Sequence, residues 1–193
     1  MKKTIIKQFS VSKAAHHIQE LLRVSGEDIQ REGLVKTPLR VAKAYEYFFK
    51  GYHEDPEAIL KKAVFCEEYS EIVMVKDIDF YSLCEHHMLP FYGKIHVGYI
   101  PRGRLVGLSK IPRLVEVFSR RLQIQERLTN QIAETFDKVL NPLGVGVVVE
   151  AFHFCIAMRG VEKQNAFAKT SSMLGVFRDN RATRMEFMEL LKK

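Results

Sequence analysis

The stretch SLCEHHMLPFYGKIHVGYIP, from Ser82 to Pro101, places a group of reactive side chains directly before an alternating apolar pattern. Cys84, Glu85, His86 and His87 bring a thiol, a carboxylate and two imidazoles together on one short piece of chain. Cys84 and His87 are both metal-ligand types, but two ligands do not complete a metal site. Interpreting this stretch as a metal site therefore requires further donors from elsewhere in the chain.

Strand patterns lie on both sides of this cluster and again near residue 150. Apolar and polar residues alternate over 72–83 and over 93–99, which predicts two strands, and residues 105–108 predict a short third strand. The almost continuous apolar run VVVEAFHFCIAM, residues 147–158, predicts a buried strand. The reactive cluster is therefore expected at the junction of two neighbouring strands.

Helical patterns account for much of the remaining chain. Apolar residues recur at helical spacing in four segments: 12–24, 37–51, 114–118 and 128–140. A last helix is expected to begin at Thr183, because Thr183 and Glu186 match a capping box. The expected order is helices, strands, helices, a strand and a helix. This order favours an α+β fold with antiparallel pairing.

The composition is typical of a globular protein and gives no sign of a membrane or disulfide-rich protein. A chain of 193 residues with 47% hydrophobic residues is long enough to bury a core as one domain. No apolar run reaches signal-peptide or membrane-span length, which predicts a cytoplasmic protein without a membrane partner. Three cysteines are a small, odd number for a disulfide scaffold, so reduced thiols are expected. The net charge of +7 fits a nucleic acid, a nucleotide or a solvated surface equally well.

His153 and Cys155 lie in the predicted buried strand and offer the missing donors. Successive side chains of a strand point to opposite faces, so these two residues would share one face. If that face meets Cys84 and His87, two thiolates and one imidazole converge, a set that suits Zn²⁺ and leaves its fourth position to water. The spacing alone leaves open the alternative that the cysteines are small buried hydrophobic residues.

Three long motifs carry a resemblance to a known family. They are CEHHMLPFYGKIHVGYIP (84–101), GLSKIPRLVEVFSRRLQIQERLTNQIA (107–133) and AFHFCIAMRG (151–160). From about Lys36 to near the C-terminus, the chain resembles GTP cyclohydrolase I. The resemblance implies an enzyme that opens the imidazole ring of GTP at C8, releases formate and forms 7,8-dihydroneopterin triphosphate. This reaction is the first step of tetrahydrofolate or tetrahydrobiopterin biosynthesis.

The resemblance also implies a metal centre and proton-transfer groups. Cys84, His87 and Cys155 are the implied Zn²⁺ ligands, and the ion would acidify a water molecule for attack at C8. His86 and His153 are implied to act as general acids and bases, because imidazole titrates near the working pH.

The substrate-binding residues follow from the same motifs. Glu126 would accept hydrogen bonds from the guanine N–H groups, with Gln125 helping to hold the base, since a carboxylate offers acceptors only. Ser109 would bond to the ribose. The triphosphate is implied to bind three basic residues: Lys110, Arg113 and Arg159. Without the resemblance, Glu126 would be only a charge at the start of a helix.

The family's fold is a T-fold, or tunnelling fold, with an antiparallel sheet and helices on one face, preceded here by N-terminal helices. Residues 1–50 would form the N-terminal helical region and residues 51–193 the catalytic region, as one structural unit. The family assembly is a homodecamer of two pentamers with active sites at subunit boundaries, so edge strands would pair between subunits. Which subunit supplies which site residue stays open.

Two other functions compete with this one. A different T-fold enzyme, such as a pterin synthase or a deazapurine nitrile reductase, would need three zinc histidines or a nucleophilic cysteine in another motif, and neither is found. A basic zinc module would need a closed ligand set, so no nucleic-acid partner is expected. The metal used in vivo, any feedback regulator and the roles of Glu85, Cys66 and residues 162–172 stay open.

Overall fold

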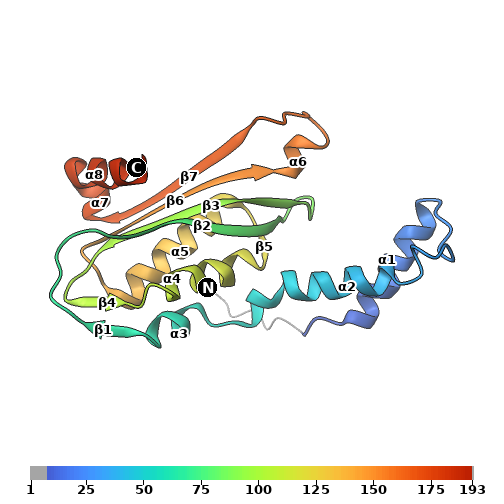
Figure 1. The fold of residues 1–193 in the computed structure, drawn as a ribbon, viewed down its shortest axis with the longest axis horizontal. Coiled ribbons are helices and arrows are strands. Elements are labelled where there is room, and N and C mark those ends of the chain that lie inside the picture. The colour runs from blue at the N-terminus through green and yellow to red at the C-terminus, as the bar shows by residue number, and fades with distance from the viewer. Residues whose placement is uncertain (1–7, 193) are drawn as a thin grey trace.

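The structure, a computed structural model, describes residues 8–192 and contains a five-stranded sheet with helices around it (Figure 1). The strands are β1 (Val64–Cys66), β2 (Val73–Cys84), β3 (Pro90–Ile100), β4 (Arg104–Val106), β5 (Leu122–Gln123), β6 (Gly144–His153) and β7 (Phe167–Gly175). The helices are α1 (Val11–Val24), α2 (Thr37–Phe48), the 3₁₀ helix η1 (Lys50–His53), α3 (Pro56–Lys61), α4 (Lys110–Ser119), α5 (Gln125–Leu140), α6 (Phe154–Ala157), α7 (Val176–Asp179) and α8 (Arg181–Lys192). Over this described range, every helix is too short or too polar to cross a bilayer.

Pairing in the main sheet, whose order is β5-β2-β3-β6-β7, is antiparallel except at one edge. β3 pairs with β6 along its length, from Phe91 opposite His153 to Ile100 opposite Gly144. β2 and β7 flank this pair and are antiparallel to β3 and β6 respectively. Only β5 runs parallel to its neighbour, β2. The predicted α+β fold with an antiparallel sheet is confirmed.

The main hydrophobic core lies between one face of this sheet and the helices α4 and α5. Ile95, Val97 and Tyr99 of β3 are fully buried there, as are alternate valines of β6. This alternation follows from strand geometry, in which every second side chain points to the same face. Helix α5 closes the core with apolar residues at helical spacing: Leu128, Ile132, Phe136, Val139 and Leu140.

A second, smaller core lies on the opposite face, at one end of the sheet. The ring of Phe187 in α8 is fully buried against Gly98 of β3 and Gly146 of β6. A Cβ at Gly98 would lie 2.7 Å from this ring, so the glycine allows the helix to approach. Helices α7 and α8 therefore cover one end of this face (Figure 1). The sequence led us to expect helices on one face only, and these two helices are an addition on the other face.

The N-terminal helices extend away from the sheet (Figure 1). Helix α1 packs against α2 and buries none of its residues completely. The chain returns to the body at Gly51 in η1, whose amide donates to the Arg120 carbonyl at 3.1 Å. A Cβ at Gly51 would lie 2.1 Å from the Val117 carbonyl oxygen, so a glycine is required for this close contact with the end of α4.

Two parts of the sheet differ from the sequence prediction. The strand predicted over residues 147–158 ends at His153, and Cys155 lies in the short helix α6. The prediction that His153 and Cys155 share a strand face is therefore wrong, because the backbone becomes helical between them. Strand β7 is absent from the prediction, since its sequence FAKTSSMLG is largely small and polar, as suits an edge strand with little burial.

The start of the last helix also differs from the prediction. Helix α8 begins at Arg181 rather than Thr183. The side-chain oxygen of Asn180 accepts hydrogen bonds from the amides of Ala182 and Thr183, at 2.9 and 3.3 Å. Asn180 therefore caps the helix three residues before the predicted capping residue, with the same chemistry.

One histidine is buried in the sheet outside the predicted site. His96 of β3 is 7% exposed, and its Nδ1 accepts a hydrogen bond from the Asp77 amide at 3.1 Å. Asp77 lies in a bulge of β2 and has a positive φ of 60°. Burial lowers the pKa of His96, an effect that the charges of Asp77 and Glu150 oppose. A protonated Nδ1 could not accept this bond, so the fold requires the neutral ring.

We expect the free energy of unfolding to fall as the pH drops below about 6.5, the ordinary pKa of histidine. Below that pH the unfolded chain protonates His96 while the folded chain does not, so acid favours unfolding until the pH also passes the folded pKa. Urea titrations from about pH 5 to about pH 7.5, at one protein concentration, measure this effect. The His96→Asn variant should lose part of the slope, whereas the matched control His17→Asn, at an exposed position of α1, should keep it. An unchanged slope in His96→Asn would contradict the expectation.

Candidate metal centre and active site

Three of the predicted site residues lie in and beside the tight loop that joins β2 to β3. Cys84 ends β2, and its amide donates to the Leu89 carbonyl at 2.9 Å. The Met88 amide donates back to the Cys84 carbonyl at 2.8 Å, and Met88 has a positive φ of 55°, which lets the chain reverse. These bonds fix the backbone that carries His86 and His87.

Cys155 reaches the same end of the sheet from the other side of β3. Because β3 is antiparallel to both neighbours, the end of β2 at Leu83 and the end of β6 at His153 flank the start of β3, at Pro90 and Phe91. Helix α6 begins directly after His153 and carries Cys155. The sheet therefore brings two segments together that lie far apart in the sequence.

The side chains of Cys84, His87 and Cys155 form one cluster. Their ligand atoms all lie within 4.8 Å of one another, and Cys84 Sγ lies 4.0 Å from His87 Nδ1. Two ligands of one tetrahedral Zn²⁺ lie roughly 3.5 to 3.8 Å apart, given metal–ligand bonds of about 2.0 to 2.3 Å. The cluster is therefore slightly wider than a closed site, and small side-chain movements would close it. The prediction that these three residues meet is confirmed.

The chemistry of this cluster fits Zn²⁺. Burial raises the pKa of the Cys155 thiol, and the neighbouring Cys84 raises it further. Two thiols this close resist ionisation together, whereas a soft cation between them stabilises both thiolates. His87 is exposed, so one side of the cluster is open to solvent. Arg159 Nη1 lies 3.3 Å from His87 Nε2, which places a guanidinium at the edge of the cluster.

The two predicted proton-transfer residues lie on different elements, His86 in the loop after β2 and His153 at the end of β6. His86 Nδ1 lies 3.8 Å from Cys84 Sγ in the loop. The ring of His153 stacks on Phe91, with centroids 4.6 Å apart and an interplanar angle of 7°. Burial lowers the pKa of His153, and the charge of Glu126 opposes this shift.

The first turn of α5 lies beside His153 and the loop. Oε1 of Gln125 lies 2.8 Å from His153 Nε2, and Glu126 follows at an exposed position. Arg127 donates to both carboxylate oxygens of Glu85, one contact being 3.1 Å, and this pairing lowers the pKa of Glu85. The start of α5 therefore contacts both the β6 end and the metal-binding loop.

Two residues around the site were not selected by the sequence analysis. Phe91 is one of many apolar strand residues, and nothing in the sequence marks it as the ring beneath His153. Arg127 looks like a solvated helix charge, and its place next to Glu126 is the signal that would have pointed to it. Both residues depend on pairings that only the folded sheet shows.

Three predicted substrate-binding residues lie away from this cluster within one chain. Ser109, Lys110 and Arg113 lie at the start of α4, which follows β4. The Val106 amide of β4 donates to the Tyr99 hydroxyl at 3.2 Å, so β4 is held near the far end of β3. The 11 residues of β3 span roughly 33 Å, and Figure 1 shows β4 near one end of the sheet and α6 near the other. A single chain therefore does not bring these three residues to the metal cluster.

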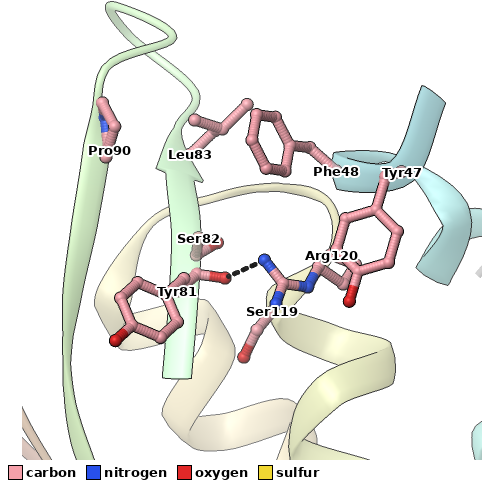
Figure 2. A pocket seen from close by; sticks show the side chains of 8 residues that line it. All are labelled: Tyr47, Phe48, Tyr81, Ser82, Leu83, Pro90, Ser119 and Arg120. Carbon is pink, nitrogen blue, oxygen red and sulfur yellow. Dashed lines mark hydrogen bonds between the residues drawn. The ribbon is translucent and has the colours of Figure 1, made fainter. Parts of the chain in front are cut away.

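A cavity of about 260 Å³ lies between α2 and the β2–β3 hairpin (Figure 2). It is lined by Tyr47, Phe48, Tyr81, Ser82, Leu83, Pro90, Ser119 and Arg120. The guanidinium of Arg120 is already paired with Glu116, at 2.9 Å, and donates to the Tyr81 carbonyl at 3.4 Å. None of the predicted site residues lines this mostly apolar cavity, so we assign the chemistry to the metal cluster instead.

Comparisons with known proteins show the family to which this chain is similar. A sequence model of the family described as GTP cyclohydrolase I matches residues 14–192. A protein named GTP cyclohydrolase 1 from Chlorobaculum tepidum is 62% identical over 174 residues, which cover 90% of this chain and 78% of that protein. A protein of the same name from Porphyromonas gingivalis is 58% identical over 187 residues, covering 97% of this chain and 96% of that protein.

A weaker similarity was found among solved structures. The crystal structure of the archaeosine synthase QueF-Like in the apo form has a TM-score of 0.46 and 20% identity, and the match covers 56% of this chain and 97% of that chain. The family model and the two relatives, by contrast, each match nearly all of this chain, and the relatives are about 60% identical to it. On that ground, this chain belongs to the GTP cyclohydrolase I family.

Proposed function

We propose that this chain opens the imidazole ring of GTP at C8 by hydrolysis, releases C8 as formate and rearranges the remainder to 7,8-dihydroneopterin triphosphate. One water is consumed for each formate released. The observation that supports this most directly is the cluster of Cys84, His87 and Cys155, with His86 and His153 beside it, in a member of this family.

Cys84, His87 and Cys155 would hold Zn²⁺, the metal on which this family depends. When bound, the ion supplies Lewis-acid activation of water for attack at C8. The remaining tasks fall to side chains of the protein. They must hold the base and the triphosphate, and they must move protons as the C8–N bonds break.

His86 and His153 are the proposed proton-transfer groups. Breaking both C8–N bonds requires protons at N7 and N9 of the base, and a positioned imidazole can deliver or remove one near neutral pH. The two histidines belong to different elements, the loop and β6. This arrangement suits a reaction with several proton transfers.

Glu126 is the proposed recognition group for guanine. Its carboxylate offers acceptors only, which matches the N1–H and the amino group of guanine and leaves adenine unpaired. It is exposed on the first turn of α5, next to the residue that contacts His153. Arg159, at the edge of the cluster, is the proposed triphosphate ligand in the same chain.

A second copy of the chain would supply Ser109 to the ribose and Lys110 and Arg113 to the triphosphate. Their distance from the metal cluster within one chain supports this proposal. Copies joined edge to edge through β7 and the part of β2 that β5 leaves unpaired would satisfy the open sheet edges, as in the homodecamer of two pentamers that the family resemblance implies. The division into residues 1–50 and 51–193 and the cytoplasmic location stay predictions.

Incubating the purified protein with GTP tests this function. Formate and, after oxidation, a fluorescent pterin should accumulate in equal amounts, because each product molecule has lost one C8. A chelator should stop both, and added Zn²⁺ should restore both. If the zinc-loaded protein produces neither, the proposal is wrong.

His86 and His87 form a matched pair for this assay. His87→Ala should lose both bound zinc and formate release, because it removes a ligand. His86→Ala should keep about one zinc per chain and lose formate release by roughly 10²- to 10⁴-fold, the range for a general acid–base group. Elemental analysis of the purified variants gives the zinc content. Loss of zinc from His86→Ala would show that His86 is a ligand.

Glu126→Gln should lower kcat/KM for GTP by roughly 10²-fold while zinc content is unchanged, because one acceptor is replaced by a donor that faces guanine N–H groups. Steady-state kinetics of formate release measure the change. Glu134→Gln is the matched control, since Glu134 is an exposed residue of the same helix. Equal kinetics for the two variants would remove Glu126 from guanine recognition.

Co-expression of two inactive variants tests the shared site. Cys155→Ala with Arg113→Ala should recover part of the activity, because a mixed assembly can combine an intact metal cluster from one copy with an intact Arg113 from another. Cys155→Ala with His87→Ala should recover none, since both changes damage the same cluster. Differently tagged chains, purified through both tags, ensure that mixed assemblies are assayed. If the first pair recovers no activity, the proposal that a second copy contributes Arg113 is contradicted.

A further inference from the structure

The side chain of Gln125 is buried, and its donors are fully used within the protein. Gln125 is 3% exposed and is the first residue of α5. Its Nε2 donates to the carbonyl oxygens of Val149 in β6 and Ala168 in β7, both at 3.1 Å. A side-chain amide nitrogen carries two hydrogens, so neither is left for a substrate.

These two carbonyls determine which end of the amide faces His153. Carbonyl oxygens only accept hydrogen bonds, so the NH₂ group of Gln125 must point toward Val149 and Ala168. Rotating the amide by half a turn would place its oxygen against both carbonyl oxygens with no hydrogen between them, which is unfavourable for buried acceptors. The Oε1 atom is therefore the one that lies 2.8 Å from His153 Nε2.

An amide oxygen cannot donate, so the hydrogen in this bond must belong to His153. A neutral imidazole carries one N–H and one lone pair on its two nitrogens. With the hydrogen on Nε2, the lone pair is on Nδ1. Within residues 8–192, Nδ1 of His153 has no hydrogen-bond partner in the protein and is not sealed from solvent. The stack on Phe91 fixes the plane of the ring.

We propose that Gln125 is a positioning residue that holds His153 in the tautomer protonated at Nε2 and keeps Nδ1 free for the substrate. This inference rests on the proposed function, in which His153 transfers protons. Gln125 thus acts through His153 rather than by holding guanine, the role expected from the sequence. In this tautomer the Nε2–H is used in the bond to Gln125, and the lone pair of Nδ1 is the one available to the substrate.

Ring ¹⁵N chemical shifts test the tautomer directly. Protein labelled with ¹⁵N in its histidine rings and loaded with Zn²⁺, without GTP, is measured at a pH where the His153 ring is neutral. The His153 signals, identified by their loss in His153→Gln, should show a protonated Nε2 and an unprotonated Nδ1. A protonated Nδ1 would overturn the inference, even if the protein turns over GTP. The variant serves only to assign these signals, and the tautomer itself is determined from the wild-type spectrum.

A split between kcat and KM tests the positioning role. Gln125→Met keeps the length of the side chain but removes the acceptor, so kcat for formate release should fall by roughly 10- to 100-fold, as for other residues that orient a functional histidine. The KM for GTP and the zinc content should stay within about twofold, because no guanine contact is lost. A large rise in KM with unchanged kcat would instead assign Gln125 to guanine binding and overturn the inference.

The double variant completes the test. If Gln125 acts only through His153, adding Gln125→Met to His153→Gln should change kcat by less than about twofold. An additional loss as large as that in the wild-type background would show that Gln125 acts independently of His153. Glu126→Gln serves as the control, because Glu126 is proposed to act on guanine rather than through His153. Its effect should therefore persist in the His153→Gln background.

Discussion

The antiparallel pairing of β3 with β2 and β6 is the constraint on which the rest of this structure depends. It places the loop after Cys84 beside the end of β6, so that donors from two distant segments meet at one end of the sheet. The same register buries Ile95 and Val97, and burying such side chains stabilises the fold by roughly 1.5 to 3 kcal/mol each. A slip by one residue would turn these side chains outward and separate the donors, so packing of the core also maintains the site.

The first turn of α5 links the separate parts of the site. Gln125 bonds to β6, β7 and His153, while Arg127 pairs with Glu85 in the metal-binding loop. Glu126 lies between these two anchors in the sequence, so its backbone is held relative to both the histidine and the loop. The exposed pair of Arg127 and Glu85 contributes little to stability, since such surface ion pairs are worth about 0 to 1 kcal/mol. The pair instead connects the loop to the start of α5.

The sequence predicted the residues of the metal cluster better than the backbone that carries them. Cys84, His87 and Cys155 are recognisable from their chemistry and motifs, and the helical stripe of α5 follows from its spacing. The turn into α6 after His153 is too short to leave a periodic pattern. Strand β7 is an edge strand with few apolar residues, and without it the second carbonyl partner of Gln125 could not be anticipated. The distance of Ser109 from the cluster depends on how β4 is held against β3, which no local pattern encodes.

The closeness of Cys84 and Cys155 has a consequence for how the protein must be kept. Their sulfurs lie within 4.8 Å, and a disulfide requires about 2.05 Å, a gap that side-chain rotation in the loop and in α6 can reduce. An oxidant that reaches the chain before the ion does can join the two sulfurs and remove both ligands at once. Reductant during purification, and loading with the ion before exposure to air, therefore preserve the chemistry of this end of the sheet.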